Sequence, residues 1–459
     1  MVDSENRLAR KFGLSSSTAI VISSMIGTGI FTTTGFLAGD LGSAGLILAI
    51  WAAGAASALL GSLCYAELGV NLAESGGEYI YLREAWGSVW AFLSGWVSFF
   101  AGFSAPIAVA ALAFAEYVGQ AAPALAGIQG TTWLDIGSGA IRIGPVQLVA
   151  ALLVVILTVL CLSGVRLSAS AQNTLTAIKL VILVLFVVLA FTIGNGDWRH
   201  FALGTARTSS TPIPRQFAIS LFYIYLSYSG WNAATYVAGE IRNPEKTLPR
   251  ALFGGTALVT AFYLLLNIVF IYGAPLTALK GQVAVGAITA SHLFGSGVGH
   301  AFAALMALSL VASVNAQTIT GPRVYFAMAA DGAFFAPAAR IHSRFGTPWI
   351  AILAQGACTL LMIVTPLPDL LQYIGFTLSV FTALGVGSLF VLRRRAGWRR
   401  LPAVSFAWPL IPALFLLPEL WIVFWGAQLR PVITLWTTVT IAAGAVVYAL
   451  SCRLRSVSD

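Results

Sequence analysis

Apolar residues run through this chain in long segments separated by short polar stretches. A helix needs about 20 predominantly apolar residues to cross a bilayer. The pattern predicts twelve such segments, at residues 15–38, 43–71, 87–118, 147–163, 174–194, 216–238, 251–273, 301–328, 348–366, 370–392, 404–426 and 431–452. The first and the sixth carry glycine beside hydroxyl residues near their centre, so they depart from a plain spanning helix.

Composition agrees with this pattern. Hydrophobic residues make up 58% of the 459 residues, charged residues make up 9%, and the mean hydropathy is +0.88. A soluble domain of this length could not bury so much apolar surface. We therefore expect an all-α membrane protein with twelve transmembrane helices.

The basic residues predict the orientation. If the amino terminus is cytoplasmic, eighteen of the 25 Lys and Arg lie on the cytoplasmic side, six lie outside, and Lys179 falls within a span. This bias predicts a multi-pass protein of the cell membrane with both termini in the cytoplasm. The net charge of +9 then reflects topology and contact with the lipid bilayer, and nucleic acid is not expected as a partner.

The four cysteines are Cys64, Cys161, Cys358 and Cys452, and all of them fall in apolar segments. Their spacing fits neither a disulfide framework nor a metal site. The outside loop at 119–146 has no cysteine. No disulfide-linked accessory subunit, metal or cofactor is expected.

In the first segment, the sequence Ile26-Gly27-Thr28-Gly29 predicts an interruption of the helix. Two glycines around a hydroxyl residue have low helix propensity. Within a bilayer, a broken helix requires protein, water or ligand to satisfy the freed backbone groups. On this stretch alone, a close helix–helix contact through small residues explains the glycines equally well.

The sixth segment has a similar stretch, in which Ser229-Gly230 precedes Asn232. Two interrupted helices that are five helices apart indicate an inverted repeat whose breaks meet at the bilayer midplane. The predicted organisation is a cytoplasmic segment at 1–14, repeats at 15–194 and 216–392, two extra helices within 404–452, and a cytoplasmic tail at 453–459.

Helix breaks expose backbone amides with partial positive charge and carbonyls with partial negative charge. Such a pair of breaks suits a zwitterion such as an α-amino acid. The predicted substrate-binding residues are Ile26, Gly27, Thr28, Gly29, Leu226, Ser227, Ser229, Gly230 and Asn232. Neither break contains Asp or Glu, so a neutral substrate side chain is favoured over a cationic one.

Lys179 is the one basic residue that the pattern places inside a span. An ionisable residue there costs roughly 2.5–3.5 kcal/mol to insert, so it is by default a functional hypothesis. The competing interpretation is that its ammonium reaches the cytoplasmic interface by snorkelling. The residues themselves assign no role to Glu67, Glu116 or Glu419.

Several motifs together resemble the amino acid-polyamine-organocation transporters, and most closely their L-type amino acid transporter branch. The motifs that carry this resemblance are Ile26-Gly27-Thr28-Gly29-Ile30-Phe31, Ser75-Gly76-Gly77-Glu78-Tyr79, Tyr228-Ser229-Gly230-Trp231-Asn232, Glu240 with Asn243-Pro244, Leu248-Pro249-Arg250, and Arg323 with Asp331-Gly332. They occur in order over most of residues 15–350.

The resemblance implies a LeuT-like fold with alternating access, the substrate carboxylate at the first break and its amine at the carbonyls of the second. It also implies that Lys179 reaches toward the first break, near the place that sodium occupies in sodium-coupled relatives. Leu226 stands where relatives often have an aromatic gate, which leaves its role as a gate open.

The function predicted on these grounds is secondary transport of neutral L-amino acids, by sodium-independent exchange or by proton coupling. An antiporter of polyamines or cationic amino acids is the alternative with the same fold. A non-transporting amino acid sensor is a third possibility, but nothing in the sequence, such as an appended signalling domain, supports it. No nucleophile–base set or phosphate-binding loop is present, so the chain is not expected to be an enzyme.

Overall fold

The computed structural model describes residues 10, 12–74, 76–122, 124, 127, 131–136, 141–163, 165–330 and 334–458. Five features singled out in the sequence lie wholly or partly outside them. These are residues 1–9 and 11 of the amino-terminal segment, Ser75, parts of the loop at 119–146, the Asp331-Gly332 pair, and Asp459 of the tail.

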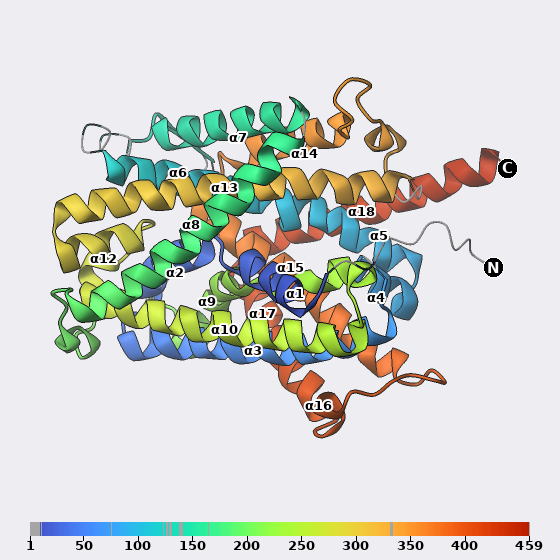
Figure 1. Cartoon of the computed structure of the whole chain (residues 1–459), viewed down its shortest axis with the longest axis horizontal. Coiled ribbons are helices and arrows are strands. Elements are labelled where there is room, and N and C mark those ends of the chain that lie inside the picture. Colours follow the sequence, from blue (N-terminus) through green and yellow to red (C-terminus); the bar gives the residue numbers. More distant parts are fainter. Residues whose placement is uncertain are drawn as a thin grey trace.

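Helices account for most of the described chain (Figure 1). In the first half they are α1 (Leu14–Met25), α2 (Gly29–Leu41), α3 (Ala44–Asn71), α4 (Glu78–Trp86), α5 (Ser88–Val97), a π-helical turn (Ser98–Ser104), α6 (Ala105–Ala121), α7 (Pro145–Ser163) and α8 (Val165–Thr192). A short 3-10 segment, Trp198–Phe201, then precedes the second half.

The second half also consists mainly of helices joined by short connections. It contains α9 (Ile213–Tyr228), a 3-10 segment (Ala233–Glu240), α10 (Pro244–Gly273), α11 (Leu276–Leu279), α12 (Val285–Phe294), α13 (Ser296–Ala330), a 3-10 segment (Ala336–Ala339), α14 (Trp349–Met362), α15 (Leu367–Leu392), α16 (Pro402–Ser405), α17 (Leu410–Leu429) and α18 (Pro431–Ser458).

Nine helices in the described part of the chain are long and apolar enough to cross a membrane. Shorter apolar helices, Ala177–Thr192 and Trp349–Met362, fall within the predicted fifth and ninth spans. The chain is therefore a helical multi-pass membrane protein. The helix predicted at 174–194 begins earlier, at Val165, and the last helix continues through most of the predicted tail to Ser458.

The loop at 119–146, whose structure was not predicted from the sequence, contains a two-stranded antiparallel hairpin of β1 (Leu134–Ile136) and β2 (Ile141–Ile143). Both strands alternate an apolar, a charged and an apolar residue, and the charged pair Asp135–Arg142 faces across the hairpin at 3.5 Å. Alternation with period two and a cross-strand ion pair favour strands.

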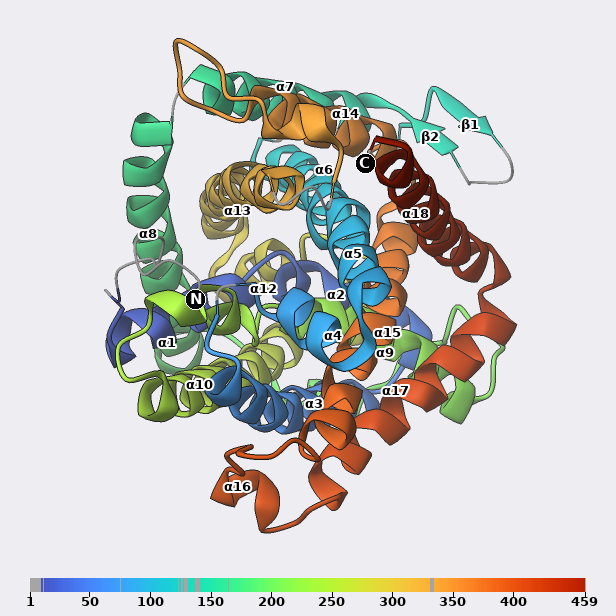
Figure 2. The same ribbon diagram turned by 90° about the vertical axis from the view of Figure 1, so that its right-hand side faces the viewer.

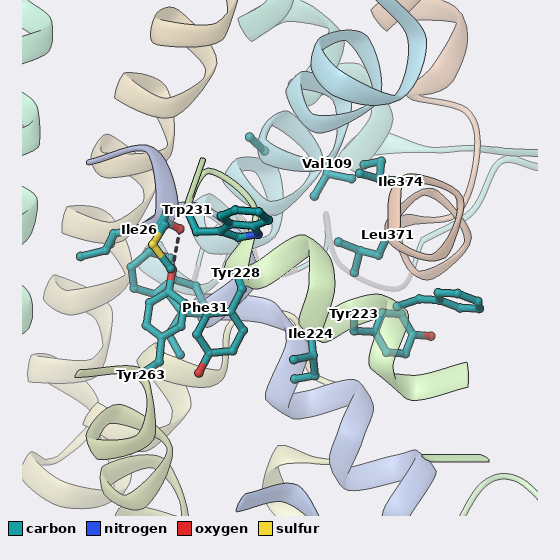
Figure 3. Packing of buried hydrophobic residues seen from close by; sticks show 14 of the residues in the cluster. Ile26, Phe31, Val109, Tyr223, Ile224, Tyr228, Trp231, Tyr263, Leu371 and Ile374 are labelled. Atoms are coloured by element: carbon teal, nitrogen blue, oxygen red, sulfur yellow. Dashed lines mark hydrogen bonds between the residues drawn. The ribbon is translucent and has the colours of Figure 1, made fainter. Parts of the chain in front are cut away.

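The helices that carry the breaks pack against the long helices of the bundle. In Figure 2, α3 and α10 run side by side beneath α1 and α2, while α6 and α13 cover the opposite side. α2 packs against α9. Large buried aromatic side chains fill the space between these helices, among them Phe31, Tyr228, Trp231 and Tyr263 (Figure 3).

Candidate functional site

The first predicted interruption is present. α1 ends at Met25 and α2 begins at Gly29, with non-helical backbone between them. The amide of Gly27 donates to the Met25 carbonyl at 2.8 Å. The amides of Thr28, Gly29 and Ile30 donate to no acceptor among the described residues. These three N–H groups open α2, where the helix dipole adds partial positive charge, so they suit an anion.

The second interruption is also present. α9 ends at Tyr228, and the chain resumes at Ala233 as a 3-10 segment, where the sequence predicted that the same spanning helix would continue. The amide of Ser229 donates to the Leu226 carbonyl at 3.0 Å, and Gly230 has φ +97°. This left-handed backbone is one that residues with a Cβ rarely adopt.

The carbonyl oxygens at the end of α9 carry partial negative charge, which complements the partial positive charge of the α2 amides. Those of Ser227 and Ser229 accept no hydrogen bond from the part of the chain that the structure describes. The carbonyl of Leu226 is already used by the Ser229 amide, and Leu226 itself is half-buried. The oxygens best placed to accept from an ammonium are therefore those of Ser227 and Ser229.

The two breaks touch, and glycine makes their contact possible. A Cβ on Gly29 would lie 2.5 Å from Ser227 Cα, and a Cβ on Gly230 would lie 2.7 Å from the carbonyl carbon of Ser24. The hydroxyls of Thr33 and Ser227 are 3.0 Å apart and bridge α2 and α9. Both explanations of the first glycine pair therefore hold, because Gly29 makes a close helix contact at an interrupted helix.

Gly27 differs from these glycines. A Cβ there would have one neighbour within 4 Å, the Met25 carbonyl oxygen at 3.8 Å. A side chain at this position would point into open space at the break instead of into another helix.

Lys179 lies on α8 and is 4% exposed. Its Nζ donates to the Ile26 carbonyl oxygen at 2.5 Å, so in this structure the ammonium is directed at the first break and does not reach the interface by snorkelling. No ion pair with a carboxylate is present for it among the described residues. Because Lys179 occupies the Ile26 carbonyl, that oxygen is less suited to the substrate amine than the sequence suggested.

Sequence reasoning missed Tyr263. This α10 residue donates its hydroxyl proton to the Met25 carbonyl oxygen at 2.6 Å, the dashed contact in Figure 3. The Met25 and Ile26 carbonyls thus each accept a hydrogen bond from a side chain of another helix, Tyr263 and Lys179 respectively. An aromatic residue in an apolar span has no sequence signal that would identify this role.

The Asn232 side chain binds Glu78, a residue of α4. Its Nδ2 donates to Glu78 Oε1 at 3.0 Å, and the Tyr65 hydroxyl donates to the same oxygen at 2.8 Å. Burial raises the pKa of the Glu78 carboxyl, and the two hydrogen bonds partly oppose that shift. Glu78 lies in the sequence motif after α3, but the motif gave no indication that it holds the second break.

Comparisons with known proteins agree with this site. Residues 12–450 match the family model described as amino acid permease. The large neutral amino acids transporter small subunit 2 of Mus musculus is 31% identical over 437 residues, which are 94% of this chain and 77% of that protein. The serine/threonine exchanger SteT of Bacillus subtilis (strain 168) is 31% identical over 416 residues, 89% of each chain.

A third relative, the b(0,+)-type amino acid transporter 1 of Homo sapiens, is 32% identical over 394 residues, which are 84% of this chain and 76% of that protein. Similarity of this extent, over nearly the whole chain, shows that this protein belongs to the amino acid permease family, in the L-type branch of the amino acid-polyamine-organocation superfamily, whose members are transporters and not enzymes.

Proposed function

We propose that this permease transports neutral L-amino acids across the cell membrane by alternating access. The fold proposed for it has twelve transmembrane helices, in which two five-helix repeats of LeuT type place their broken first and sixth helices together and two further helices follow. Both termini lie in the cytoplasm, in keeping with the distribution of Lys and Arg.

One observation carries the proposal. Three amides at the start of α2 and two carbonyls at the end of α9 have no hydrogen-bond partner among the described residues, and they belong to elements that touch at Gly29 and Ser227. The amides of Thr28, Gly29 and Ile30 bind the substrate carboxylate, and the carbonyls of Ser227 and Ser229 bind its amine. Ile26, Gly27, Leu226 and Gly230 shape the site around them.

Both breaks lack acidic side chains, which favours a substrate with an uncharged side chain. The relatives' names point the same way, since they describe a transporter of large neutral amino acids and an exchanger of serine and threonine. The alternative with a cationic amino acid or a polyamine would leave the second positive charge without a carboxylate partner in either break.

Sodium-independent exchange is the proposed mode of transport. The ammonium of Lys179 supplies a fixed positive charge beside the first break, where a coupling cation would otherwise be needed. If Lys179 releases its proton during the cycle, transport is coupled to protons instead. No disulfide-linked subunit is needed, since the outside loop at 119–146 has no cysteine.

Counterflow into proteoliposomes tests the proposal. We expect internal neutral amino acids to stimulate uptake without a sodium gradient, and a pH gradient to have little effect. Stimulation by arginine or putrescine stronger than by leucine or serine would instead favour the cationic alternative. Binding without flux would identify a sensor.

Two glycine substitutions, one at the first break and one on α10, test the location of the site. Gly27→Ala places a methyl group at the first break without meeting another helix, whereas Gly254→Ala adds one on α10 where nothing lies within 4 Å. We expect Gly27→Ala to reduce counterflow about tenfold or more through loss of substrate contacts worth roughly 1.4 kcal/mol, with Gly254→Ala unchanged. Equal activity of the two variants would refute the site.

A further inference from the structure

A pocket of about 360 Å³ lies away from the two breaks, between the end of α15 and the start of α17. It is lined by Phe390, Arg393, Arg394, Arg400, Trp408 and Pro409. Because α15 ends at Leu392 and α17 begins at Leu410, the pocket lies where two consecutive spanning helices leave the membrane. Figures 1 and 2 show the loop that contains α16 projecting from the bundle beside α3 and α17.

One wall of the pocket is fixed by a buried ion pair. Arg393 donates from Nε and Nη2 to the two carboxylate oxygens of Glu67 at 2.5 and 2.6 Å. Glu67, on α3, is fully buried and also accepts from Trp398 Nε1 and the Leu401 amide, each at 3.0 Å. A bidentate pair of this kind orients the guanidinium and neutralises it.

Aromatic residues pack against the same arginine. The guanidinium carbon of Arg393 lies 3.9 Å from the centre of the Trp408 ring, and the Phe390 ring lies 5.0 Å from Trp408. Cation–π and ring contacts hold the indole in one place. The pocket is therefore formed before any ligand arrives.

The remaining two arginines of the pocket carry its free charge. Arg394 and Arg400 are exposed, and their guanidinium groups form no ion pair or hydrogen bond within the described residues. The neighbouring carboxylate, that of Glu84, already pairs with Arg395 at 2.8 Å. No acidic residue lines the pocket. Two unpaired guanidinium groups at a concave surface suit a phosphate group, which arginine binds through paired N–H donors.

An apolar surface continues from the rim of the pocket along the adjoining span. Phe406 is 94% exposed, and Leu410, Leu414 and Leu417 are exposed at the spacing of one helix face of α17. Residues three and four apart on a helix lie on the same face. A ligand with a phosphate at one end and hydrocarbon chains at the other matches this combination of a basic pocket and an apolar stripe.

We propose that this pocket binds the phosphate headgroup of an anionic phospholipid, with Arg394 and Arg400 on the phosphate and the acyl chains along the exposed face of α17. A lipid in this pocket would contact the loop between α15 and α17, on the side of the membrane where most of the basic residues are predicted to lie. It uses none of the residues proposed to bind the amino acid.

Lipid retention by the purified protein tests this site. The probes are phosphatidylglycerol, phosphatidylcholine and inorganic phosphate, and bound lipid is counted by native mass spectrometry during titration. The test variant is Arg394→Gln/Arg400→Gln. Its matched control, Arg399→Gln/Arg340→Gln, removes the same charge from two exposed arginines that do not line the pocket.

We expect the protein to retain phosphatidylglycerol in preference to phosphatidylcholine. The test variant should bind it about 30-fold more weakly, because each arginine beside an anionic lipid contributes roughly fivefold, while the control keeps nearly full affinity. Thermal melting of all three proteins verifies their folding.

Three outcomes would overturn the proposal. Equal weakening in the two double variants would mean that lipid responds to total charge and not to this pocket. Equal retention of phosphatidylcholine would exclude recognition of an anionic headgroup. Displacement of the lipid by millimolar inorganic phosphate would assign the pocket to a soluble anion.

Discussion

The two helix breaks meet at one site, but different kinds of contact hold them in place. At the first break, the carbonyls of Met25 and Ile26 accept hydrogen bonds from Tyr263 and Lys179, which belong to distant helices. The second break is held by turns of its own backbone around Gly230, together with the side-chain hydrogen bonds of Ser227 and Asn232.

Because of this difference, the two breaks are expected to respond to different substitutions. The first break depends on an ionisable side chain, so a change in the charge of Lys179 alters the hydrogen bonding at Ile26 directly. The second break is determined by local backbone conformation and by the link from Asn232 to Glu78. Side chains from distant helices therefore hold the first break, whereas the second combines its own backbone turns with a hydrogen bond from Asn232 to Glu78.

Substitution at Gly230 is expected to have the largest effect. Gly230→Ala combines a positive φ, which costs a residue with a Cβ about 1–3 kcal/mol, with a collision against Ser24 that costs about as much again. Thermal melting and counterflow should both be severely reduced. The control Gly295→Ala has φ +92° but nothing within 4 Å of the new Cβ, so it isolates the backbone strain. Equal melting of the two variants would show that the close contact of the breaks contributes nothing.

Removal of the Lys179 side chain is expected to have the next largest effect. Lys179→Ala leaves the buried Ile26 carbonyl without its donor, which costs about 1–3 kcal/mol, and removes the positive charge beside the first break. We expect counterflow to fall by roughly tenfold or more, with membrane insertion retained.

Lys280 provides the matched control for that variant. Its Nζ also donates to a backbone carbonyl, that of Ala206 at 2.5 Å, but at an exposed position outside the breaks. Lys280→Ala should transport normally. Unaltered uptake by Lys179→Ala would remove the lysine from the mechanism and leave Tyr263 as the distant side chain that holds the first break.

The smallest effect is expected at Glu78, and it depends on pH. Because burial raises the Glu78 pKa, the folded state holds its proton at pH values where the unfolded chain has released it. Stability contributed by Glu78 is therefore fully present below the unfolded pKa, about 4.3, and is lost as pH rises through the raised folded value.

Glu78→Gln should remove this pH dependence, since the amide oxygen can still accept from Tyr65 and Asn232. The check is the melting temperature of both proteins measured from pH 4 upward in one buffer series. A wild-type profile that rises with pH over this range would contradict the assignment.

The sequence was most informative where residue types conflict with their surroundings. Gly27 and Gly29 in an apolar helix predicted the first interruption, Ser229 and Gly230 predicted the second, and a single lysine within a span marked Lys179. In each case a residue is costly in a plain spanning helix, so its presence requires a reason.

Partners supplied from distant parts of the chain were not predictable in this way. Tyr263 and Glu78 are ordinary residues for their segments, and their roles arise only when the helices pack. The 3-10 form of Ala233–Glu240 was likewise not predicted, since its first six residues lie within the predicted span at 216–238. The hairpin at Leu134–Ile136 and Ile141–Ile143 was too short to give a clear alternating pattern.

The long-range bonds at the first break also bear on how the protein is made. Lys179 follows Ile26 by 153 residues and Tyr263 follows Met25 by 238, so α1 and α2 leave the ribosome long before either donor has been synthesised. A buried carbonyl in lipid without a donor is unfavourable by several kcal/mol. The Met25 carbonyl can already accept from the nearby Gly27 amide, but among the described residues the Ile26 carbonyl has Lys179 as its only donor. The Ile26 carbonyl must therefore stay in contact with water or with the insertion machinery until α8 arrives, which makes the order of synthesis part of the assembly of the transport site.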